Sequence, residues 1–320
     1  MTFTIGVDLG GTKTAAGLVA ADGSVVRRVS APTPAVSGPG AILQTIVDLA
    51  TRLTESAPGV VIAGCGIGAA GVIDPVSRTV RFATNSLPGW AGTQLGDELE
   101  RRLGVPVATV NDVHAHAIGE AVHGAGRGEC TVLVIAAGTG IGGALVINGR
   151  LQSGRHGAAG HYGHMPAAEA AGLACTCGGG GHLEAIASGP PIREAYLRGG
   201  GSVPRDSQEI FARADAGDPL AAEVIAVAAT ALGRSIGGLI NSVDPDLVIV
   251  GGGLAAAGAR WWDVVVHQAR AEAMGLLADC RIVPTTLGAN SAIVGAATLI
   301  TAASLDAAPQ HLSTLHSSLT

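Results

Sequence analysis

Two segments of the chain share one pattern, in which an apolar strand, a glycine-rich turn and a second apolar strand follow one another. The first segment is Thr4–Ala20, with its turn at Gly10–Thr14, and the second is Thr131–Val146, with its turn at Gly138–Gly143. The apolar stretches have the length of buried strands, and the glycines mark tight turns. Two units of such similar chemistry are typical of a duplicated architecture. We therefore expect an α/β protein with two related halves.

The composition indicates a compact globular protein, large enough for two modest domains. Of 320 residues, 48% are hydrophobic and only 2% are aromatic, so aliphatic side chains must form nearly all of the core. The net charge of −6 comes without clusters of Lys and Arg, which argues against a nucleic-acid partner. The sequence has no leader pattern and no run of about 18 apolar residues, so we expect a cytoplasmic protein without a membrane segment.

Helix and strand patterns alternate through the rest of the chain. We expect further strands at 25–30, around Ile67, at 106–110 and at 247–250, and helices at about 40–56, up to Leu103, at 190–197 and at 219–243. Residues 151–189 hold four of the ten histidines and show little periodicity, which indicates an irregular segment. The end of the chain is rich in Ser, Ala and Thr and is expected to fray.

The first turn has the composition of a phosphate-binding loop. A carboxylate precedes it, its glycines leave backbone N–H groups free to face an anion, and a hydroxyl and an ammonium group follow. These groups belong to Asp8, Gly10, Gly11, Thr12 and Lys13. A plain glycine hairpin is the alternative interpretation. A dinucleotide-binding fold would need G-x-G-x-x-G between a strand and a helix, and we reject it because this turn leads into another strand.

Two further glycine turns stand at strand ends. The second unit offers another phosphate cradle, formed by Gly138, Thr139, Gly140, Gly142 and Gly143. After the strand at 247–250, Gly252 and Gly253 could admit a nucleotide base or ribose against the bare backbone. Three such turns at separate strand ends are hard to explain by packing alone.

The irregular segment contains His164, Cys175, Cys177 and His182. Two imidazoles and two thiolates in one short segment can close tetrahedrally around zinc, and a closed site without a water position would be structural. A Cys-x-Cys pair suits a metal site in a reducing compartment better than a disulfide. The alternative is an exposed His182 with three ligands or an empty site. We assign the other cysteines to buried packing, namely Cys65, Cys130 and Cys280.

The chain resembles the ROK family of bacterial sugar kinases and repressors over nearly its whole length. The motifs occur in the family's order, namely DLGGTK at 8–13, Asn111-Asp112, GTGIGG at 138–143 and a glycine–histidine stretch followed by Cys-x-Cys-Gly. The resemblance implies an actin-like ATPase (ribonuclease H-like) fold, in which two domains flank a cleft that holds the sugar, with ATP against the larger domain.

The resemblance also implies a division of the chain. A smaller domain would comprise residues 1–112, completed by a C-terminal helix at about 291–304. A larger domain would comprise 113–290 and include the zinc segment 156–189, and residues 305–320 would form a flexible tail. Family repressors carry an added N-terminal helix-turn-helix domain, and we expect none here because the kinase motif already begins at Asp8.

By the same resemblance, Asp112 corresponds to the catalytic base. A sugar hydroxyl is a poor nucleophile until a carboxylate within hydrogen-bond reach accepts its proton. Asn111 would orient the sugar, although an Asn-Asp pair can also be a simple helix cap. Asp8 would help to position Mg²⁺ on the phosphates of ATP. The sugar-facing positions are then Asn85, Asn111, Asp112, His161, His164 and Glu184.

ATP is the expected donor, since polyphosphate-using members of the family lack the zinc segment. Most members are dimers or tetramers, so the resemblance implies a homo-oligomer. A sugar-sensing protein without catalysis is a further alternative, and the intact DLGGTK motif and Asp112 argue against it.

The sequence departs from the family pattern at two positions. Glucose kinases have GEIGH where this chain has His161 in the stretch 160–164, and His182 replaces a third cysteine of CxCGxxGC. A carboxylate only accepts hydrogen bonds, whereas neutral imidazole has one donor and one acceptor. Bacterial N-acetylmannosamine kinases share the GHxGH pattern, so we expect 6-phosphorylation of N-acetylmannosamine, with glucose as the alternative. A third possibility is that His161 only packs against the metal ligands.

Overall fold

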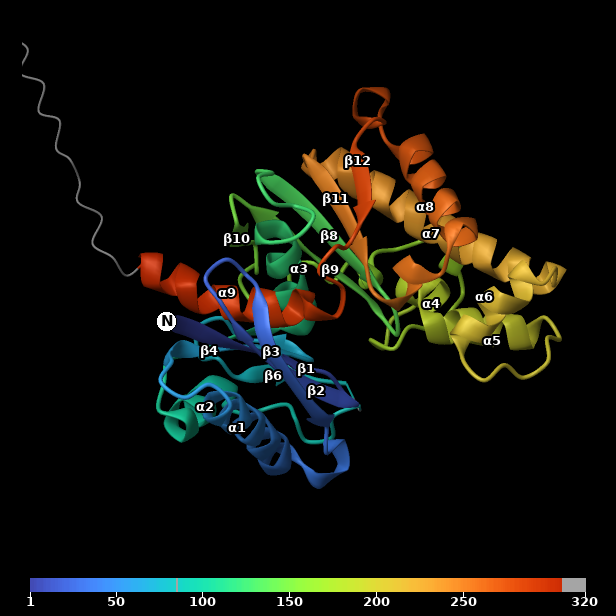
Figure 1. The fold of residues 1–320 in the computed structure, drawn as a ribbon. Coiled ribbons are helices and arrows are strands. Elements are labelled where there is room, and N and C mark those ends of the chain that lie inside the picture. The colour runs from blue at the N-terminus through green and yellow to red at the C-terminus, as the bar shows by residue number, and fades with distance from the viewer. Residues whose placement is uncertain (85, 307–320) are drawn as a thin grey trace, which may run out of the picture.

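Two five-stranded sheets form the frame of the molecule (Figure 1). The computed structural model describes residues 1–84 and 86–306, with the backbone alone over 302–306. The first sheet has the order β3 (Val25–Pro32), β2 (Lys13–Val19), β1 (Thr2–Leu9), β4 (Val61–Ala69) and β7 (Val107–Asn111). The second has the order β10 (Arg150–Leu151), β9 (Ile141–Ile147), β8 (Thr131–Ala137), β11 (Leu247–Gly251) and β12 (Arg281–Pro284).

The two sheets are built on one plan. Strand β1 pairs with β2 in antiparallel and with β4 in parallel orientation, and β8 pairs in the same way with β9 and β11. The outer strands continue the correspondence, because β3 and β10 are antiparallel to their neighbours whereas β7 and β12 are parallel to theirs. The duplicated architecture expected from the two glycine turns is confirmed. The turns themselves lie at equivalent places, between β1 and β2 and between β8 and β9.

Helices α1 (Pro39–Glu55) and α2 (Leu95–Leu103) pack on one face of the first sheet. In α1 the apolar side chains recur every three or four residues and share a buried cluster with β1 and β4, namely Ile42, Ile46, Leu49 and Leu53. Burial of each such side chain contributes about 2 kcal/mol. The short strands β5 (Val72–Ile73) and β6 (Val80–Phe82) form a separate two-stranded sheet beside this half.

The outer face of the second sheet is covered by a group of helices, α4 (Glu184–Ala187), α5 (Gly189–Arg198), α6 (Ser207–Asp215), α7 (Pro219–Val243) and α8 (Ala259–Glu272). Among the described helices, α7 alone is long and apolar enough to cross a membrane by length and composition. However, 56% of its most apolar window is buried inside the fold, and α7 packs against α5, α6 and α8 as a core helix does.

Helices α3 (Asp112–Val122) and α9 (Ser291–Asp306) lie side by side between the sheets (Figure 1). Helix α3 buries Ala117 and Ala121 against the second sheet, whereas α9 buries Ile293 and Ala297 against the first. A Cβ atom added at Gly295 would overlap the carbonyl oxygen of a residue of α3, so only glycine permits this crossing. The two helices therefore join the halves through close backbone contact.

Most of the predicted elements are found close to their expected bounds. The predicted helices at 40–56, 190–197 and 219–243 correspond to α1, α5 and α7. Residues 151–189 are irregular as expected, with only short helical turns such as Tyr162–His164 and Ala168–Ala170. Helices α3, α6 and α8 were not predicted. In α8 the buried residues Trp261, Val265 and Ala269 recur every four positions, so this helical spacing was a signal that the prediction overlooked.

Three expectations need correction or comment. Of the cysteines assigned to buried packing, only Cys65 is buried, since Cys130 is exposed and Cys280 is half-buried. The last helix continues to Asp306, beyond the expected 304 and into the first residues of the predicted tail, because α9 keeps its helical hydrogen bonds there. The rest of that tail lies outside the described residues. The division of the chain after Asp112 stays a prediction.

Candidate active site

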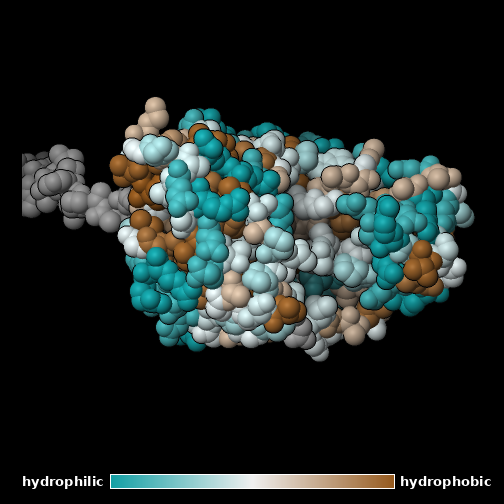
Figure 2. All heavy atoms as spheres, turned by 60° about the horizontal axis from the view of Figure 1, so that its bottom comes forward, coloured by the Kyte–Doolittle hydropathy of each residue, from teal (hydrophilic) through white to brown (hydrophobic). Residues whose placement is uncertain are grey.

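A cavity of about 400 Å³ opens between the two halves, where Figure 2 shows the surface hollowed. The end of β7 contributes Asn111 and Asp112, and the second glycine turn contributes residues 138–143. The irregular segment adds His161 and His164, together with Thr176, Cys177 and Glu184. Residues 70–72, 82–84, 86 and 87 close the side formed by the first half. The predicted sugar-binding residue Asn85 lies outside the described residues.

Asn111 caps helix α3. Its Oδ1 accepts hydrogen bonds from the backbone N–H groups of Val113 at 2.9 Å and His114 at 3.3 Å, and its Nδ2 donates to the carbonyl oxygen of Gly71 at 2.9 Å. The cap considered for the Asn-Asp pair is therefore present. Asp112 is left at the first position of the helix, facing the cavity, and burial raises the pKa of its carboxyl. The cap fixes the backbone from which Asp112 projects.

Asp8 is electrostatically linked to Asp112. Burial and then the charge of Asp112 raise the pKa of Asp8 to about 6, against the opposing effects of Arg28 and Lys13. Asp8 pairs in the sheet with Gly68 of the neighbouring strand β4, and a Cβ atom added at Gly68 would lie 3.5 Å from the Cα atom of Asp112. Two carboxylates near one another and near a cavity favour a divalent cation.

The first glycine turn is braced by the end of β3. Thr33 donates its hydroxyl to the carbonyl oxygen of Gly10 at 2.8 Å, and the N–H of Gly10 bonds to the carbonyl oxygen of Lys13 at 3.1 Å. Thr12 and Lys13 are exposed. Although all residues of this turn are described, none from Gly10 to Lys13 lines the 400 Å³ cavity, so the turn lies at its margin.

The second turn lies against two cavities. Gly138 and Thr139 line both the large cavity and a neighbouring cavity of about 320 Å³. Gly252 lines the large cavity and Gly253 the neighbouring one, so the third glycine turn also stands between them. The rest of the smaller cavity is formed by residues that sequence analysis did not select, including Arg193, Ser207 and Gln208. No motif marks them, because they come together only when α5 and α6 fold onto the sheet.

One ring nitrogen of His161 forms a hydrogen bond within the protein. Its Nδ1 lies 2.8 Å from the carbonyl oxygen of Ala158. A carbonyl oxygen can only accept, so Nδ1 carries the hydrogen and Nε2 of the neutral ring is an acceptor. The N–H group that distinguishes imidazole from a carboxylate is therefore hydrogen-bonded to the backbone and is not available to a sugar.

His114, which sequence analysis missed, forms a hydrogen bond to the carbonyl group of the next residue, Ala159. Its Nε2 donates to the oxygen of Ala159 at 2.7 Å, and burial lowers the pKa of this imidazole. His114 belongs to α3, two residues after Asp112, so it ties the helix of the predicted base to the loop that presents His161. Its position close to Asp112 in the sequence was the available signal.

Glu184 bridges two segments of the site. Its Oε2 accepts from the N–H of Ile141 at 2.9 Å, and its Oε1 accepts from the hydroxyl of Thr176 at 2.8 Å. Thr176 was also missed, although it stands between two predicted metal ligands. The carboxylate lines the large cavity and has lone pairs left over for a ligand.

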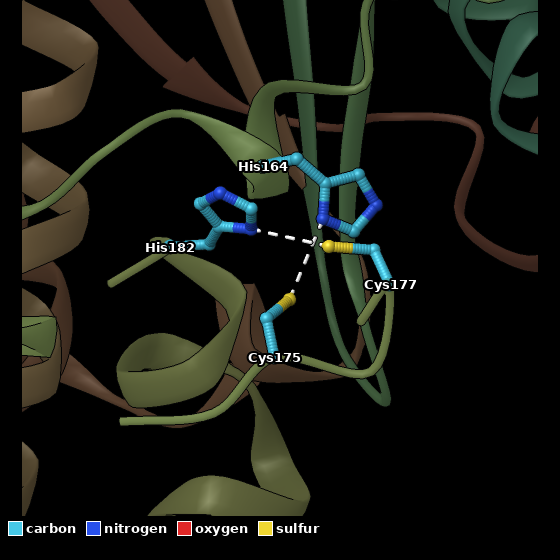
Figure 3. Close-up of side chains that lie close together, drawn as sticks. All are labelled: His164, Cys175, Cys177 and His182. Carbon is cyan, nitrogen blue, oxygen red and sulfur yellow. Dashed lines mark hydrogen bonds between the residues drawn. The ribbon is translucent and has the colours of Figure 1, made fainter. Parts of the chain in front are cut away.

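The four predicted metal ligands point toward a common centre (Figure 3). Their ligand atoms all lie within 4.8 Å of one another, with Cys175 Sγ 3.6 Å from His164 Nδ1 and Cys177 Sγ 3.2 Å from His182 Nδ1. Tetrahedral zinc with ordinary bond lengths would separate sulfur and nitrogen by about 3.6 Å. The donor set and its spacing therefore fit zinc. His182 points into this cluster rather than to solvent.

Comparison with known proteins agrees with this geometry. Residues 4–303 match the model of the ROK family. The glucokinase of Thermotoga maritima is 34% identical over 312 residues, covering 92% of this chain and 96% of that protein. The N-acetylmannosamine kinase of Escherichia coli is 36% identical over 255 residues, covering 79% of this chain and 84% of that protein.

Solved structures show the same fold. The ROK hexokinase of Thermus thermophilus superposes with a TM-score of 0.85 at 32% identity, covering 95% of this chain and 99% of that one. The ROK glucokinase of Streptomyces griseus, solved with glucose and AMPPNP, gives 0.78 at 33% identity, covering 93% and 98%. The chain therefore belongs to the ROK family and is a sugar phosphotransferase with an actin-like ATPase fold.

Proposed function

We propose that this protein transfers the γ-phosphoryl group of ATP to the 6-hydroxyl of a hexose, with Asp112 as general base. The observation that carries the proposal is the position of Asp112 at a capped helix start, on the wall of the cavity that the second glycine turn also lines. Asp112 would accept the proton of the hydroxyl as the phosphoryl group arrives. Burial raises its pKa, so its carboxylate is a stronger base than that of an ordinary aspartate.

The nucleotide would extend from the margin of the large cavity into the smaller one. Its phosphates would lie between the turns at 10–13 and 138–143, whose backbone N–H groups suit an anion. The nucleoside would occupy the 320 Å³ cavity beside Gly253. Because Gly138 and Thr139 line both cavities, a nucleotide in one reaches a sugar in the other. Asp8 would hold Mg²⁺, directly or through water, and the ion would neutralise charge on the phosphate oxygens.

The sugar remains a choice between two candidates. The GHxGH pattern and the similarity to the N-acetylmannosamine kinase favour N-acetylmannosamine. The hydrogen bond of His161 to Ala158 favours glucose as a second candidate, because a neutral ring held in this way offers the sugar an acceptor, as the glutamate of GEIGH does. Either sugar can donate to Nε2, through a hydroxyl or an acetamido N–H group.

Zinc would be held by His164, Cys175, Cys177 and His182 and would be structural. His164 and Cys177 also line the large cavity, so the metal would stabilise the wall that faces the sugar. Elemental analysis should find one zinc per chain. His182→Cys, which restores the family's cysteine, should retain the metal, whereas His182→Ala should lower its affinity. His156→Ala is the matched control, because His156 is an exposed histidine of the same segment outside the cluster.

The decisive experiment is a coupled ADP-release assay with Mg-ATP and a panel of N-acetylmannosamine, N-acetylglucosamine, glucose and mannose. Preference for N-acetylmannosamine would support the GHxGH interpretation, and preference for glucose would indicate that His161 replaces the glutamate of GEIGH without changing the sugar. Absence of turnover with every sugar, combined with sugar-dependent thermal stabilisation, would instead favour a sugar-sensing protein. A cytoplasmic location and assembly into a dimer or tetramer stay predictions, the latter testable by light scattering.

A further inference from the structure

Glu184 lies where three parts of the site meet. It begins helix α4 and lines the cavity, while its two carboxylate oxygens contact different segments. Oε2 accepts from Ile141 of the second glycine turn, and Oε1 accepts from Thr176 of the metal segment. A carboxylate offers about four acceptor positions, so these two bonds orient the group without exhausting it. The orientation of Glu184 therefore depends on groups outside α4.

The contact with the glycine turn is close. A Cβ atom added at Gly140 would lie 2.7 Å from Oε2 of Glu184, so only glycine allows the carboxylate to approach the backbone here. The next residue, Ile141, begins β9 and gives its N–H to the same oxygen. The absence of a side chain at position 140 thus leaves room for the carboxylate of Glu184.

The contact with the metal segment is made by a side chain whose neighbours are metal ligands. Thr176 stands between Cys175 and Cys177 in a tight turn, in which the N–H of Gly178 bonds to the carbonyl oxygen of Cys175 at 3.0 Å. The N–H of Cys175 in turn bonds to the carbonyl oxygen of Gly179 at 2.8 Å. Thr176 itself is exposed and lines the cavity, so core packing does not explain its side chain.

We propose that Thr176 is a positioning residue, which orients Glu184 for the sugar and links the metal segment to the glycine turn at 138–143. The inference rests on the proposed function, because the sugar would be the group that uses the free lone pairs of Glu184. Without the hydroxyl of Thr176, Oε1 loses its partner and the carboxylate can turn away from both the sugar and Ile141.

The test compares Thr176→Val, which removes the hydroxyl at nearly constant shape, with Thr176→Ser, which keeps it. Calorimetry without nucleotide measures the affinity for N-acetylmannosamine or glucose, whichever the unmodified enzyme phosphorylates. NMR measures hydrogen exchange of the Ile141 amide, and elemental analysis measures the metal. We expect Thr176→Val to weaken sugar binding about tenfold and to speed exchange at Ile141, with the metal retained. Thr176→Ser should restore both.

Thr79→Val is the matched control, since the Thr79 hydroxyl bonds only locally to the carbonyl oxygen of Ser77 in the first half. It should change neither sugar affinity nor exchange at Ile141. Unchanged affinity and exchange in Thr176→Val would overturn the inference while leaving the kinase proposal intact. Loss of metal in Thr176→Val would also overturn the inference. So would a Thr176→Ser variant that restores neither the sugar affinity nor the slow exchange at Ile141. If no sugar is phosphorylated but exchange at Ile141 responds as expected, the kinase proposal fails and the link through Glu184 stands.

Discussion

His161 donates its Nδ1–H to the carbonyl oxygen of Ala158, 2.8 Å away, and this bond decides what the ring can offer a sugar. The neutral ring presents an acceptor at Nε2, as a carboxylate would. The substitution of histidine for glutamate in GEIGH therefore changes the charge at this position more than it changes the direction of hydrogen bonding.

The first prediction follows from this bond. His161→Glu should keep kcat/KM for the preferred sugar within about tenfold, because it preserves an acceptor, whereas His161→Phe should raise KM by about tenfold or more. The ¹⁵N shifts of the His161 ring should show a protonated Nδ1 and a bare Nε2. A ring with its hydrogen on Nε2, or equal activity of the Glu and Phe variants, would contradict the acceptor role.

The second prediction concerns Asp112. Asp112→Asn should lower kcat by about two to four orders of magnitude, since the amide cannot accept the proton of the sugar hydroxyl. The fold should persist, because the cap of α3 is made by Asn111 and an amide oxygen can replace the Asp112 Oδ1 that accepts from the N–H of Val113 at 2.9 Å. Calorimetry should show sugar binding retained. Turnover close to that of the unmodified enzyme would remove Asp112 from the mechanism.

Local patterns predicted the frame of the molecule well. The glycine turns and their flanking apolar strands identified β1, β2, β8 and β9, and these define both sheets. The Cys and His spacing predicted the cluster of four ligands, because all of them belong to one short segment. Both predictions depend on residues that are close in the sequence.

Contacts between segments that are distant in the sequence could not be predicted from local patterns. The hydrogen bond of His114 to the carbonyl oxygen of Ala159 joins residues 45 positions apart, and no residue type marks a backbone acceptor. Helix α3 was missed because Ile118 is the one large aliphatic side chain on its buried face, which otherwise consists of alanine, glycine and polar residues. The helix is stabilised by packing against α9. The partners of its buried carboxylate, Glu120, lie as far as 171 residues away. Tertiary packing rather than helix propensity determines this part of the fold.

The third prediction concerns pH. The pKa of Asp8 is raised from its ordinary 3.8 to about 6, first by burial and then by Asp112, so the folded state binds a proton that the unfolded state has already lost. Without added Mg²⁺, stability should therefore fall as pH rises from about 4 to about 6 and stay reduced above that. Asp8→Asn should remove this loss, which is on the order of 1 to 3 kcal/mol.

Thermal unfolding of the unmodified protein and of Asp8→Asn across this pH range, in buffer without added Mg²⁺, shows whether stability falls as pH rises. Mg²⁺ should stabilise the unmodified protein most above pH 6, where Asp8 is ionised, and should stabilise Asp8→Asn less. Parallel stability curves for the two proteins would show that Asp8 does not titrate differently in the folded state.

The last prediction concerns Glu120, a fully buried carboxylate on α3. Burial alone would raise its pKa, but hydrogen bonds from the backbone of Thr286 and Leu287, from the hydroxyl of Ser291 and from the N–H of Ala125 lower it below its ordinary 4.5. The donors of Thr286, Leu287 and Ser291 tie α3 to the loop that precedes α9 and to the first residue of α9. The ionised carboxylate therefore stabilises the crossing between the two halves, and this contribution should be lost as pH falls through the folded-state pKa.

Glu120→Gln should lower the free energy of unfolding by about 2 to 4 kcal/mol at neutral pH, because an amide cannot accept all of these hydrogen bonds and its own N–H group would face other donors. Glu129→Gln is the matched control, since Glu129 forms an exposed ion pair with Arg281 at 2.6 Å, and it should change stability by less than about 1 kcal/mol. Denaturant unfolding measures both. The difference between the variants should shrink at acidic pH, because protonation weakens the bonds of Glu120 in the unmodified protein. An equal, small effect of the two substitutions would show that the loop before α9 is held by its backbone alone.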